Sequence, residues 1–297
     1  MAERFHPGEI AVQERAGVRE QASKVGRILR TAIEPDAAEF LEDRPLLVLA
    51  SVDSEGRPWA SPMTGTPPLL RVDGSSEVEL FGSIPPGDPI HDNLASPRPL
   101  GILALDPSTR SRYRVNGVGE AIGGGRFRLA VVEVFGNCRK YIQVRHLDTR
   151  ASVRGTGARE GPALTPSQRA WMGRTDTVFI ASIAEGGADA SHRGGNPGFV
   201  RVEEDGTLVI PDYSGNNMFQ TLGNIAVTGV AGLLLIDFET GRALQLTGRA
   251  EIDWDPGRRA GFAGANRLLR VSPERVIETP DAVAVRGRVE EYSPFNP

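Results

Sequence analysis

Lysine is nearly absent from this chain. Lys24 and Lys140 are the only lysines among 34 basic residues, so the remainder are arginines. A phosphate-binding P-loop requires a Gly-Lys-Ser or Gly-Lys-Thr triplet, and neither triplet occurs. Any phosphate site in this protein must therefore rely mostly on arginine side chains and backbone N–H groups.

Cysteine is equally scarce. A single cysteine, Cys138, excludes an internal disulfide framework and a zinc or iron–sulfur site built from several cysteines. The chain contains no His-Glu-x-x-His motif and no clustered histidines, so we expect no metal site. A Gly-x-Ser-x-Gly hydrolase motif is missing, and no Gly-x-Gly-x-x-Gly segment opens a helix after a strand, which argues against a Rossmann dinucleotide site.

Long apolar runs and an excess of positive charge are also missing. The longest mostly apolar stretch, residues 226–236, is far shorter than the roughly 20 residues that a membrane-spanning helix needs. The formal net charge of −4 argues against a nucleic-acid binder, which needs a basic surface. The N-terminus has no apolar signal core, so we expect a cytoplasmic protein without membrane or nucleic-acid partners.

What the chain contains is a mainly β pattern with flanking helices. Its 297 residues predict two domains or one large one. Loosely helical spacing predicts one or two helices within residues 8–33 and a further helix at residues 36–43. Short apolar or alternating segments, separated by glycine and proline, predict strands at residues 46–53, 69–72, 77–81, 100–105, 112–118 and 127–135.

A polar, glycine-rich stretch at residues 149–161 is the best candidate for a linker. A short helix is predicted directly after it, at Pro166–Met172, with Thr165 as its N-cap. The predicted division is an N-terminal helical arm (1–40), a first barrel domain (41–148), a linker (149–164) and a second barrel domain (165–297).

The two halves of the chain resemble each other at a nearly constant offset. Ala50-Ser51-Val52 matches Ala181-Ser182-Ile183, and GILALD from Gly101 matches GLLLID from Gly232 at the same offset. VNGVGEA from Val115 also aligns with LTGRAEI from Leu246, again at that offset. These ordered matches predict a duplicated barrel whose two copies pack like a two-fold dimer, with a site at their interface. The duplication either replaces a homodimer or builds a larger assembly, such as a homodimer of this chain.

Two polar segments of the second half are candidates for a phosphate site. The first, DASHRGGNPGFVRV at residues 189–202, reads as a glycine-rich loop whose N–H groups, with Arg193, suit a phosphate, or as a plain hairpin turn with a surface arginine. The second, PDYSGNNMFQTLGNI at residues 211–225, places Tyr213, Asn216 and Asn217 at the start of a helix-like stretch. A helix start attracts anions, although these residues also suit an ordinary N-cap.

At these segments the chain resembles a known family, the pyridoxamine 5'-phosphate oxidase-like FMN-binding split barrels. Residues 189–202 look like the Asp-x-Ser-x-Arg-Gly-x-x-Pro-Gly-Phe-Val signature of one branch. Residues 211–225, followed by GLLLIDFETGRALQLTGRAEI, look like the rest of that barrel. GRPWASP and GNCRKYIQ in the first half also look like segments of predicted flavin-nucleotide-binding proteins, so the resemblance covers roughly residues 40–290.

The resemblance implies two tandem split β-barrels packed as a pseudo-dimer, with FMN in the groove between them. It places phosphate or flavin contacts at Ser191, Arg193, Arg201, Tyr213, Asn216, Asn217, Asn137, Lys140, Tyr141 and Gln143. The first half has no matching arginine segment after Trp59, so we expect one site per chain. His192 is a candidate acid, base or substrate anchor and equally a plain turn residue. Cys138 is a candidate redox thiol or a small buried hydrophobe.

The function that follows is an FMN-dependent oxidoreductase acting on a small-molecule substrate or electron donor. Two alternatives stay open: a non-catalytic flavin or nucleotide binder that serves as a store or sensor, and the same barrel using the deazaflavin F420 or haem. The sequence does not identify the substrate.

Overall fold

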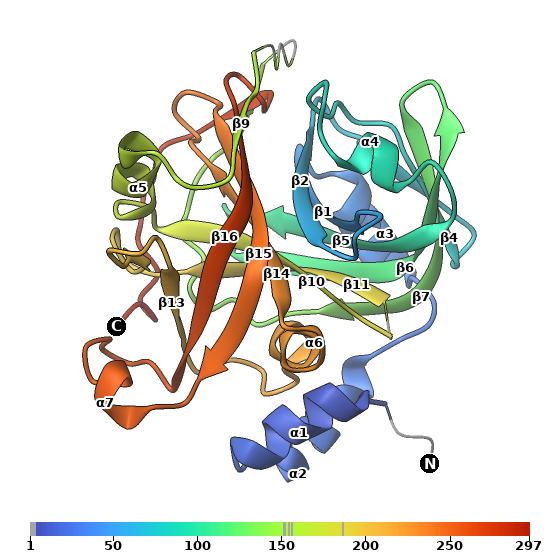
Figure 1. Ribbon diagram of the computed structural model, residues 1–297. Helices are drawn as coiled ribbons and strands as arrows, with labels where there is room; N and C mark the ends of the chain where they lie inside the picture. The colour runs from blue at the N-terminus through green and yellow to red at the C-terminus, as the bar shows by residue number, and fades with distance from the viewer. Residues whose placement is uncertain (1–3, 151–152, 154, 156, 186) are drawn as a thin grey trace.

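Two antiparallel sheets carry the fold (Figure 1). The computed structural model describes residues 4–150, 153, 155, 157–185 and 187–297. The elements of the first half, in chain order, are α1 (Pro7–Arg15), α2 (Arg19–Val25), the 3-10 turn η1 (Gly26–Ile28), α3 (Pro35–Glu42), β1 (Leu46–Val52), β2 (Pro58–Thr64), β3 (Leu70–Asp73), β4 (Glu77–Leu80), α4 (Ile90–Asn93), β5 (Arg98–Asp106), β6 (Ser111–Gly123), β7 (Arg126–Gly136) and β8 (Asp148–Thr149).

The second half repeats the succession from α3 to β7, with α7 inserted before its last long strand. Its members are β9 (Arg159–Gly161), α5 (Pro166–Met172), β10 (Thr177–Ala184), β11 (Gly187–Gly194), β12 (Arg201–Val202), β13 (Leu208–Asp212), α6 (Gln220–Thr228), β14 (Val230–Ile236), β15 (Ala243–Asp253), α7 (Pro256–Arg259), β16 (Arg267–Thr279) and β17 (Val285–Arg286). The helix predicted at residues 36–43 is confirmed by α3, and α5 begins at Thr165 with a full capping box, as predicted.

The two sheets have the same strand order. The first runs β2-β1-β5-β6-β7-β4-β3 and the second runs β11-β10-β14-β15-β16-β13-β12. The pairing registers agree as well, because Ala50 faces Gly101 across β1 and β5, and Ala181 faces Gly232 across β10 and β14. The predicted fold class, mainly β with flanking helices and built from two tandem split barrels, is confirmed.

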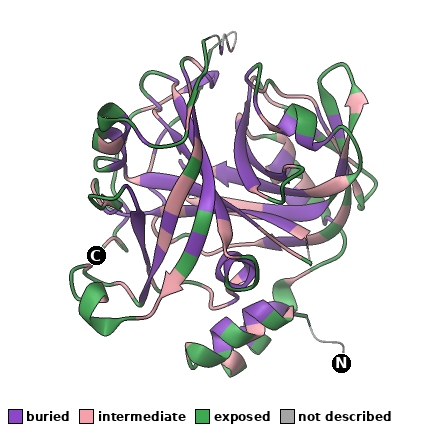
Figure 2. Cartoon of the chain, in the orientation of Figure 1, coloured by how far each residue is buried: buried purple, intermediate pink, exposed green. Residues whose placement is uncertain are grey.

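Each sheet encloses a core, and a third core lies between the two halves. On β1, Leu47 and Leu49 point into the core of the first half, whereas Leu46 and Val48 point into the third core, as strand alternation requires. Phe179 of β10 also belongs to this third core. Central strands are therefore buried on both faces, as the purple ribbons in Figure 2 show. The halves are packed together rather than loosely tethered.

The N-terminal arm packs against the second half. Helix α1 lies beside α6 (Figure 1), and the Gln13 side chain donates a hydrogen bond to Met218 O at 2.8 Å. Gly8 allows this approach, because a Cβ atom there would lie 2.4 Å from Gly223 O. The described part of the N-terminal arm therefore packs on α6.

The described ends of the predicted linker are paired with strands. Residues 148–149 form β8, which pairs with β17, and residues 159–161 form β9, which pairs with the long strand β16. Residues 151, 152, 154 and 156 of this segment lie outside the described residues. The division into domains at the predicted bounds stays a prediction. Among the residues described, none of the helices has the length and apolarity needed to cross a membrane.

Two equivalent glycines stand where the halves meet. A Cβ atom on Gly101 of β5 would lie 2.7 Å from Ala188 O, and one on Gly232 of β14 would lie 2.3 Å from Pro58 O. Both contacts are shorter than packed atoms allow, so the sheets can approach this closely only with glycine at these positions.

We therefore expect Gly101→Ala to lower the free energy of unfolding by about 2 kcal/mol or more, as overpacking of a core does. Gly215→Ala is the matched control, since a Cβ atom there meets no atom within 4 Å. The measurement is chemical unfolding followed by circular dichroism. Equal stability of the two variants would contradict the close approach of the sheets.

Candidate functional site

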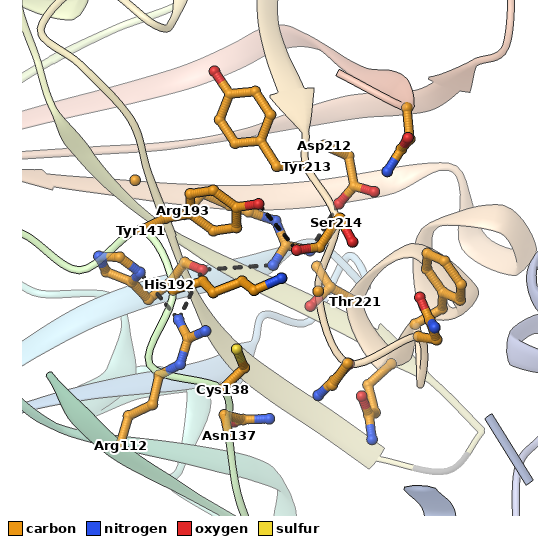
Figure 3. A pocket seen from close by; sticks show the side chains of 18 of the residues that line it. Arg112, Asn137, Cys138, Tyr141, His192, Arg193, Asp212, Tyr213, Ser214 and Thr221 are labelled. Carbon is orange, nitrogen blue, oxygen red and sulfur yellow. Dashed lines mark hydrogen bonds and ion pairs between the residues drawn. The ribbon is translucent and has the colours of Figure 1, made fainter. Parts of the chain in front are cut away.

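A small, strongly cationic pocket lies between the two halves (Figure 3). We call it the arginine pocket; its volume is about 80 Å³. The lining residues come from β6, the segment after β7, the end of β11, the segment between β13 and α6, the start of α6, and the start of β16. They are Arg112, Arg114, Asn137, Cys138, Lys140, Tyr141, His192, Arg193, Gly194, Asp212, Tyr213, Ser214, Gly215, Asn216, Asn217, Phe219, Gln220, Thr221, Asn266 and Arg267.

The structure brings most of the predicted site residues to this one pocket. Three segments distant in sequence converge there, and the predicted members among the lining residues are Asn137, Cys138, Lys140, Tyr141, His192, Arg193, Tyr213, Asn216 and Asn217. Their meeting point is a tight contact between the halves, because a Cβ atom on Gly194 would lie 2.0 Å from Tyr141 O. Tyr141 also donates from its hydroxyl to Ser214 O at 3.0 Å.

Two further predicted residues lie behind the pocket wall. Ser191 is fully buried, and its hydroxyl accepts a hydrogen bond of 2.9 Å from Thr221 of α6. Gln143 is also buried; its amide donates to Gly195 O at 3.0 Å, and its oxygen accepts from Ser293 N at 2.8 Å. Both residues support the segments that line the pocket and do not line it themselves.

Arg201, another predicted site residue, does not line the arginine pocket. It belongs to β12, a two-residue strand at the edge of the second sheet. Its guanidinium donates to Gly261 O and stacks over the Phe262 ring at 4.0 Å. The edge position turns this side chain toward the region around α7 and away from the seam between the halves.

The local structure of both candidate segments also differs from the prediction. Residues 189–194 are not a glycine-rich loop but the end of strand β11, which pairs along its length with β10. Asn216 and Asn217 do not begin a helix, since α6 starts at Gln220. Asn217 and Phe219 both have positive φ angles, 64° and 65°, and left-handed residues cannot continue into a right-handed helix.

The pocket has more positive than negative charge. Five cationic side chains line it: Arg112, Arg114, Lys140, Arg193 and Arg267. Asp212 lies 3.7 Å from Arg193 Nη2 and 3.5 Å from Arg267 Nε, and Asp189 accepts from Arg114 at 3.1 Å. Burial, together with the nearby Arg114 and Arg193, lowers the pKa of Arg112 to about 9. The protein alone thus leaves positive charge uncompensated here, which favours an anionic ligand.

His192 is held as a neutral ring in this cationic setting. Burial, and then the charge of Arg112 and other nearby arginines, lowers the pKa of His192 well below its ordinary value. Its Nδ1 atom lies 3.1 Å from Arg112 Nη1. Arginine can only donate, so Nδ1 accepts and the ring proton sits on Nε2. In this state His192 orients Arg112 rather than adding a further charge.

Several buried polar atoms at the pocket have no hydrogen-bond partner among the described residues. They are Arg112 Nε, Arg114 Nε, Arg267 Nε, Arg267 Nη1, Asn137 Nδ2 and Asn137 Oδ1. A buried donor without an acceptor costs about 1–3 kcal/mol, so such atoms are rare unless a ligand or water completes them. Arg267 Nε lies 3.5 Å from Asp212 but forms no hydrogen bond with it. Donors of three arginines without a hydrogen-bond partner around one small pocket are what a phosphate-like anion requires.

Sequence reasoning missed Arg112, Arg114 and Arg267. The repeat could have indicated the first two. Arg114 pairs with Leu103 in the first sheet, and Gln245 pairs with Leu234 in the second, so Arg114 and Gln245 are equivalent positions at the offset that relates the halves. At the positions equivalent to Arg112 and Arg114, the second half has Ala243 and Gln245. Strand β6 thus carries two arginines that the equivalent strand β15 lacks. Such a difference indicates that a binding site is retained on only one side of the interface between the halves.

The duplication relates the arginine pocket to an equivalent place on the other side of the interface between the halves, which we call the seam. At that place, other side chains stand where the pocket has arginines. Met63 occupies the position on β2 that Arg193 occupies on β11, since they pair with Leu47 and Val178 respectively. Met63 and Ala243 are buried in hydrophobic cores. Gln245 donates to Asp88 at 2.9 Å and to Ala60 O at 2.9 Å.

A second, larger cavity adjoins the arginine pocket at Gln220, which lines both. We call it the arm chamber; its volume is about 580 Å³. Its wall comes from the N-terminal arm and both sheets, and is formed by Arg4, His6, Glu9, Leu29, Arg30, Thr31, Asn116, Val132, Glu133, Gly187, Ala188, Asp189, Gln220 and Asn224. Asp189, in the chamber wall, pairs with Arg114 of the arginine pocket, so this buried ion pair links the two spaces.

Comparisons with known proteins give the following findings. No protein-family model and no curated protein matches the chain. Similar solved structures include HupZ of Group A Streptococcus (14% identity, 44% of this chain and 98% of that one, TM-score 0.31). A second is a "putative pyridoxamine 5'-phosphate oxidase" from Lactobacillus delbrueckii (18% identity, 36% of this chain and 95% of that one, TM-score 0.28). A third is the FAD binding protein from Mycobacterium smegmatis (14% identity, 39% of this chain and 93% of that one, TM-score 0.29). The Lactobacillus delbrueckii structure bears the name of the family that the sequence resembles.

One prediction follows from the arm chamber. Burial first, and then the nearby charges of Glu133 and Asp189, raise the pKa of Glu9 from 4.5 to about 8. The folded protein therefore binds this proton more tightly than the unfolded chain, and the free energy of unfolding falls as pH rises from about 4.5 to 8.

Glu9→Gln mimics the protonated carboxyl, so the free energy of unfolding of this variant should be close to that of the original protein at pH 5 and exceed it by about 4 kcal/mol at pH 8.5. The measurement is the free energy of unfolding at both pH values. Glu14→Gln, an exposed position on the same helix, is the control and should show no such pH-dependent gain. A gain of equal size at pH 5 would count against the raised pKa.

Proposed function

We propose that this protein binds one FMN per chain, with the phosphate group in the arginine pocket. The observation that carries the proposal is the set of unpartnered buried N–H groups on Arg112, Arg114 and Arg267 around one space between the halves. Arg193 adds a fourth guanidinium, which is partly neutralised by Asp212. Planar guanidinium groups match a phosphate in charge and in geometry.

The dimensions of the pocket support a phosphate rather than a whole nucleotide. Sites for cofactors and drug-sized ligands are about 300–1,000 Å³, whereas the arginine pocket is about 80 Å³. The phosphate would fill it, and the rest of the cofactor would lie outside it. Tyr141 and Tyr213, whose ring centroids are 5.1 Å apart, present aromatic surface beside the pocket (Figure 3). Lys140 and Asn137 add further donors.

A single site per chain follows from the differences between the halves. The shared strand order and the constant offset between the matching segments support an origin by duplication. The arginines stand on one side of the seam, and Ala243, Gln245 and Met63 stand at the equivalent positions on the other. These equivalent positions on the other side of the seam therefore offer no comparable set of arginines for an anion.

The proposed activity is that of an oxidoreductase. A bound flavin supplies the hydride or electron transfer, whereas the protein supplies binding and orientation. Arg112, Arg193 and Arg267 would hold the phosphate, and neutral His192 would orient Arg112 through the contact of 3.1 Å. Cys138 lines the same pocket and would lie near the phosphate end of the cofactor rather than serve as a structural hydrophobe.

The sharpest test concerns Arg193. Arg193→Ala should weaken FMN binding roughly 10- to 100-fold through the loss of one charge-assisted contact, and should leave riboflavin binding within about twofold. Titration followed by flavin fluorescence measures both affinities. Arg201→Ala is the matched control, because Arg201 lies outside the pocket, and it should change neither affinity. Unchanged FMN affinity in Arg193→Ala, with the fold intact by circular dichroism, would refute the phosphate site.

A second experiment separates an enzyme from a store. The purified protein loaded with FMN should absorb near about 375 and 450 nm, the bands of oxidised flavin. Anaerobic NADH or NADPH should bleach the longer-wavelength band, and an added acceptor should restore it. A flavin that binds but is not bleached indicates the storage or sensor alternative. The spectrum of any cofactor released on denaturation distinguishes FMN from F420 and haem.

A further inference from the structure

The arm chamber is as rich in hydrogen-bond acceptors as the arginine pocket is in donors. Glu9 from α1 and Glu133 from β7 both line it. Neither carboxylate forms an ion pair with an arginine or lysine in the part of the chain that the structure describes. Glu9 accepts from His6 N at 2.8 Å, and Glu133 lies 3.4 Å from the Asn116 amide, which can instead turn its nitrogen toward Ala188 O.

Gln220 supplies a second, independent indication of a ligand. This residue is more than nine-tenths buried, with a relative exposure of 6%, and lines the chamber. The amide nitrogen makes only a long contact of 3.6 Å with the Met218 sulfur, and the oxygen accepts no hydrogen bond from any residue that the structure describes. A carboxamide oxygen that has no donor on a largely buried side chain at a cavity wall is free to accept an N–H or O–H group from a ligand or water.

The cations in and beside the chamber wall do not neutralise these acceptors. Arg114, which lines the adjoining arginine pocket, is paired with Asp189. Arg4 donates to Gly26 O at 2.9 Å, and Arg30 donates to Arg27 O and to Glu34. His6, whose ring contacts Asn224 at 2.8 Å, has a pKa lowered by burial, so it adds no charge near neutral pH.

We propose that the arm chamber binds an organic cation, a primary ammonium group held by Glu9, Glu133 and the oxygen of Gln220. A primary ammonium carries three donors, one each for Glu9, Glu133 and the oxygen of Gln220. A metal ion fits less well, because no group of three acidic or histidine side chains among the described residues is close enough to hold one. A cavity of about 580 Å³ also has room for the carbon skeleton of an amine.

The raised pKa values agree with such a ligand. Burial and the charge of Asp189 raise the pKa of Glu133 to about 7, and that of Glu9 is about 8. Both carboxyls are therefore partly protonated while the chamber holds no cation, and a bound ammonium would favour their ionised forms. The charged and titratable groups around them are Arg4, His6, Arg30, Arg114, Glu185 and Asp189.

The test compares benzylammonium chloride with benzyl alcohol, a neutral molecule of similar shape, by calorimetric titration into the full-length protein. Benzylammonium should bind at least tenfold more tightly at pH 8. Its affinity should also rise between pH 6 and pH 8.5, because the carboxyls ionise over that range while the amine stays charged.

Glu133→Gln keeps the size of the side chain and removes its charge, so it should weaken benzylammonium binding about tenfold. Glu77→Gln changes a half-buried residue of β4 that is paired with Arg128; it is the matched control and should leave that affinity unchanged. Equal binding of amine and alcohol, no amine binding, or unchanged affinity in Glu133→Gln would each overturn the assignment. FMN titration of the same variants tests the arginine pocket separately, since Glu133 does not line it.

Discussion

The close crossing of the two sheets is the constraint on which the rest of the structure depends. Gly101 and Gly232 let the backbone of each half approach the backbone of the other at Ala188 and Pro58. A larger side chain at either position would force the sheets apart and open the apolar core between them. The same approach brings β6 against the end of β11, which is how Arg112 and Arg114 of one half reach His192 and Asp189 of the other.

Two spaces of opposite character result from this contact. The arginine pocket presents unpaired donors, whereas the arm chamber presents unpaired acceptors, and the buried Arg114–Asp189 pair links them. Like charges are costly to bury together, so each cluster is stable only with partners of opposite sign close by. The N-terminal arm is part of this arrangement, because Glu9 on α1 completes the chamber wall that the two sheets leave open.

Much of the fold could be predicted from the sequence, because hydrophobic periodicity and turn residues are local signals, and the internal repeat is found by comparing the chain with itself. Helix α5 begins at the predicted cap, Thr165, and the offset between the halves recurs in the pairing of Ala50 and Ala181. The site was only partly accessible. Motif segments indicated His192 and Arg193, but Arg267 comes to the pocket from the far strand β16, and no local pattern marks that. Arg201 belongs to the same motif but does not line the pocket, since position in a motif does not determine which way an edge strand faces.

The single-chain arrangement has a consequence for how such a protein can change. In a homodimer every substitution appears twice, so a cluster of buried arginines on one side of the seam imposes an identical cluster on the other. Here Arg114 and Gln245 occupy equivalent positions and differ, as do Arg193 and Met63. Covalent joining removes the symmetry requirement. One side of the interface between the halves can then hold ordinary core residues, while the other side, built from both halves, keeps a charged and less stable surface for ligands.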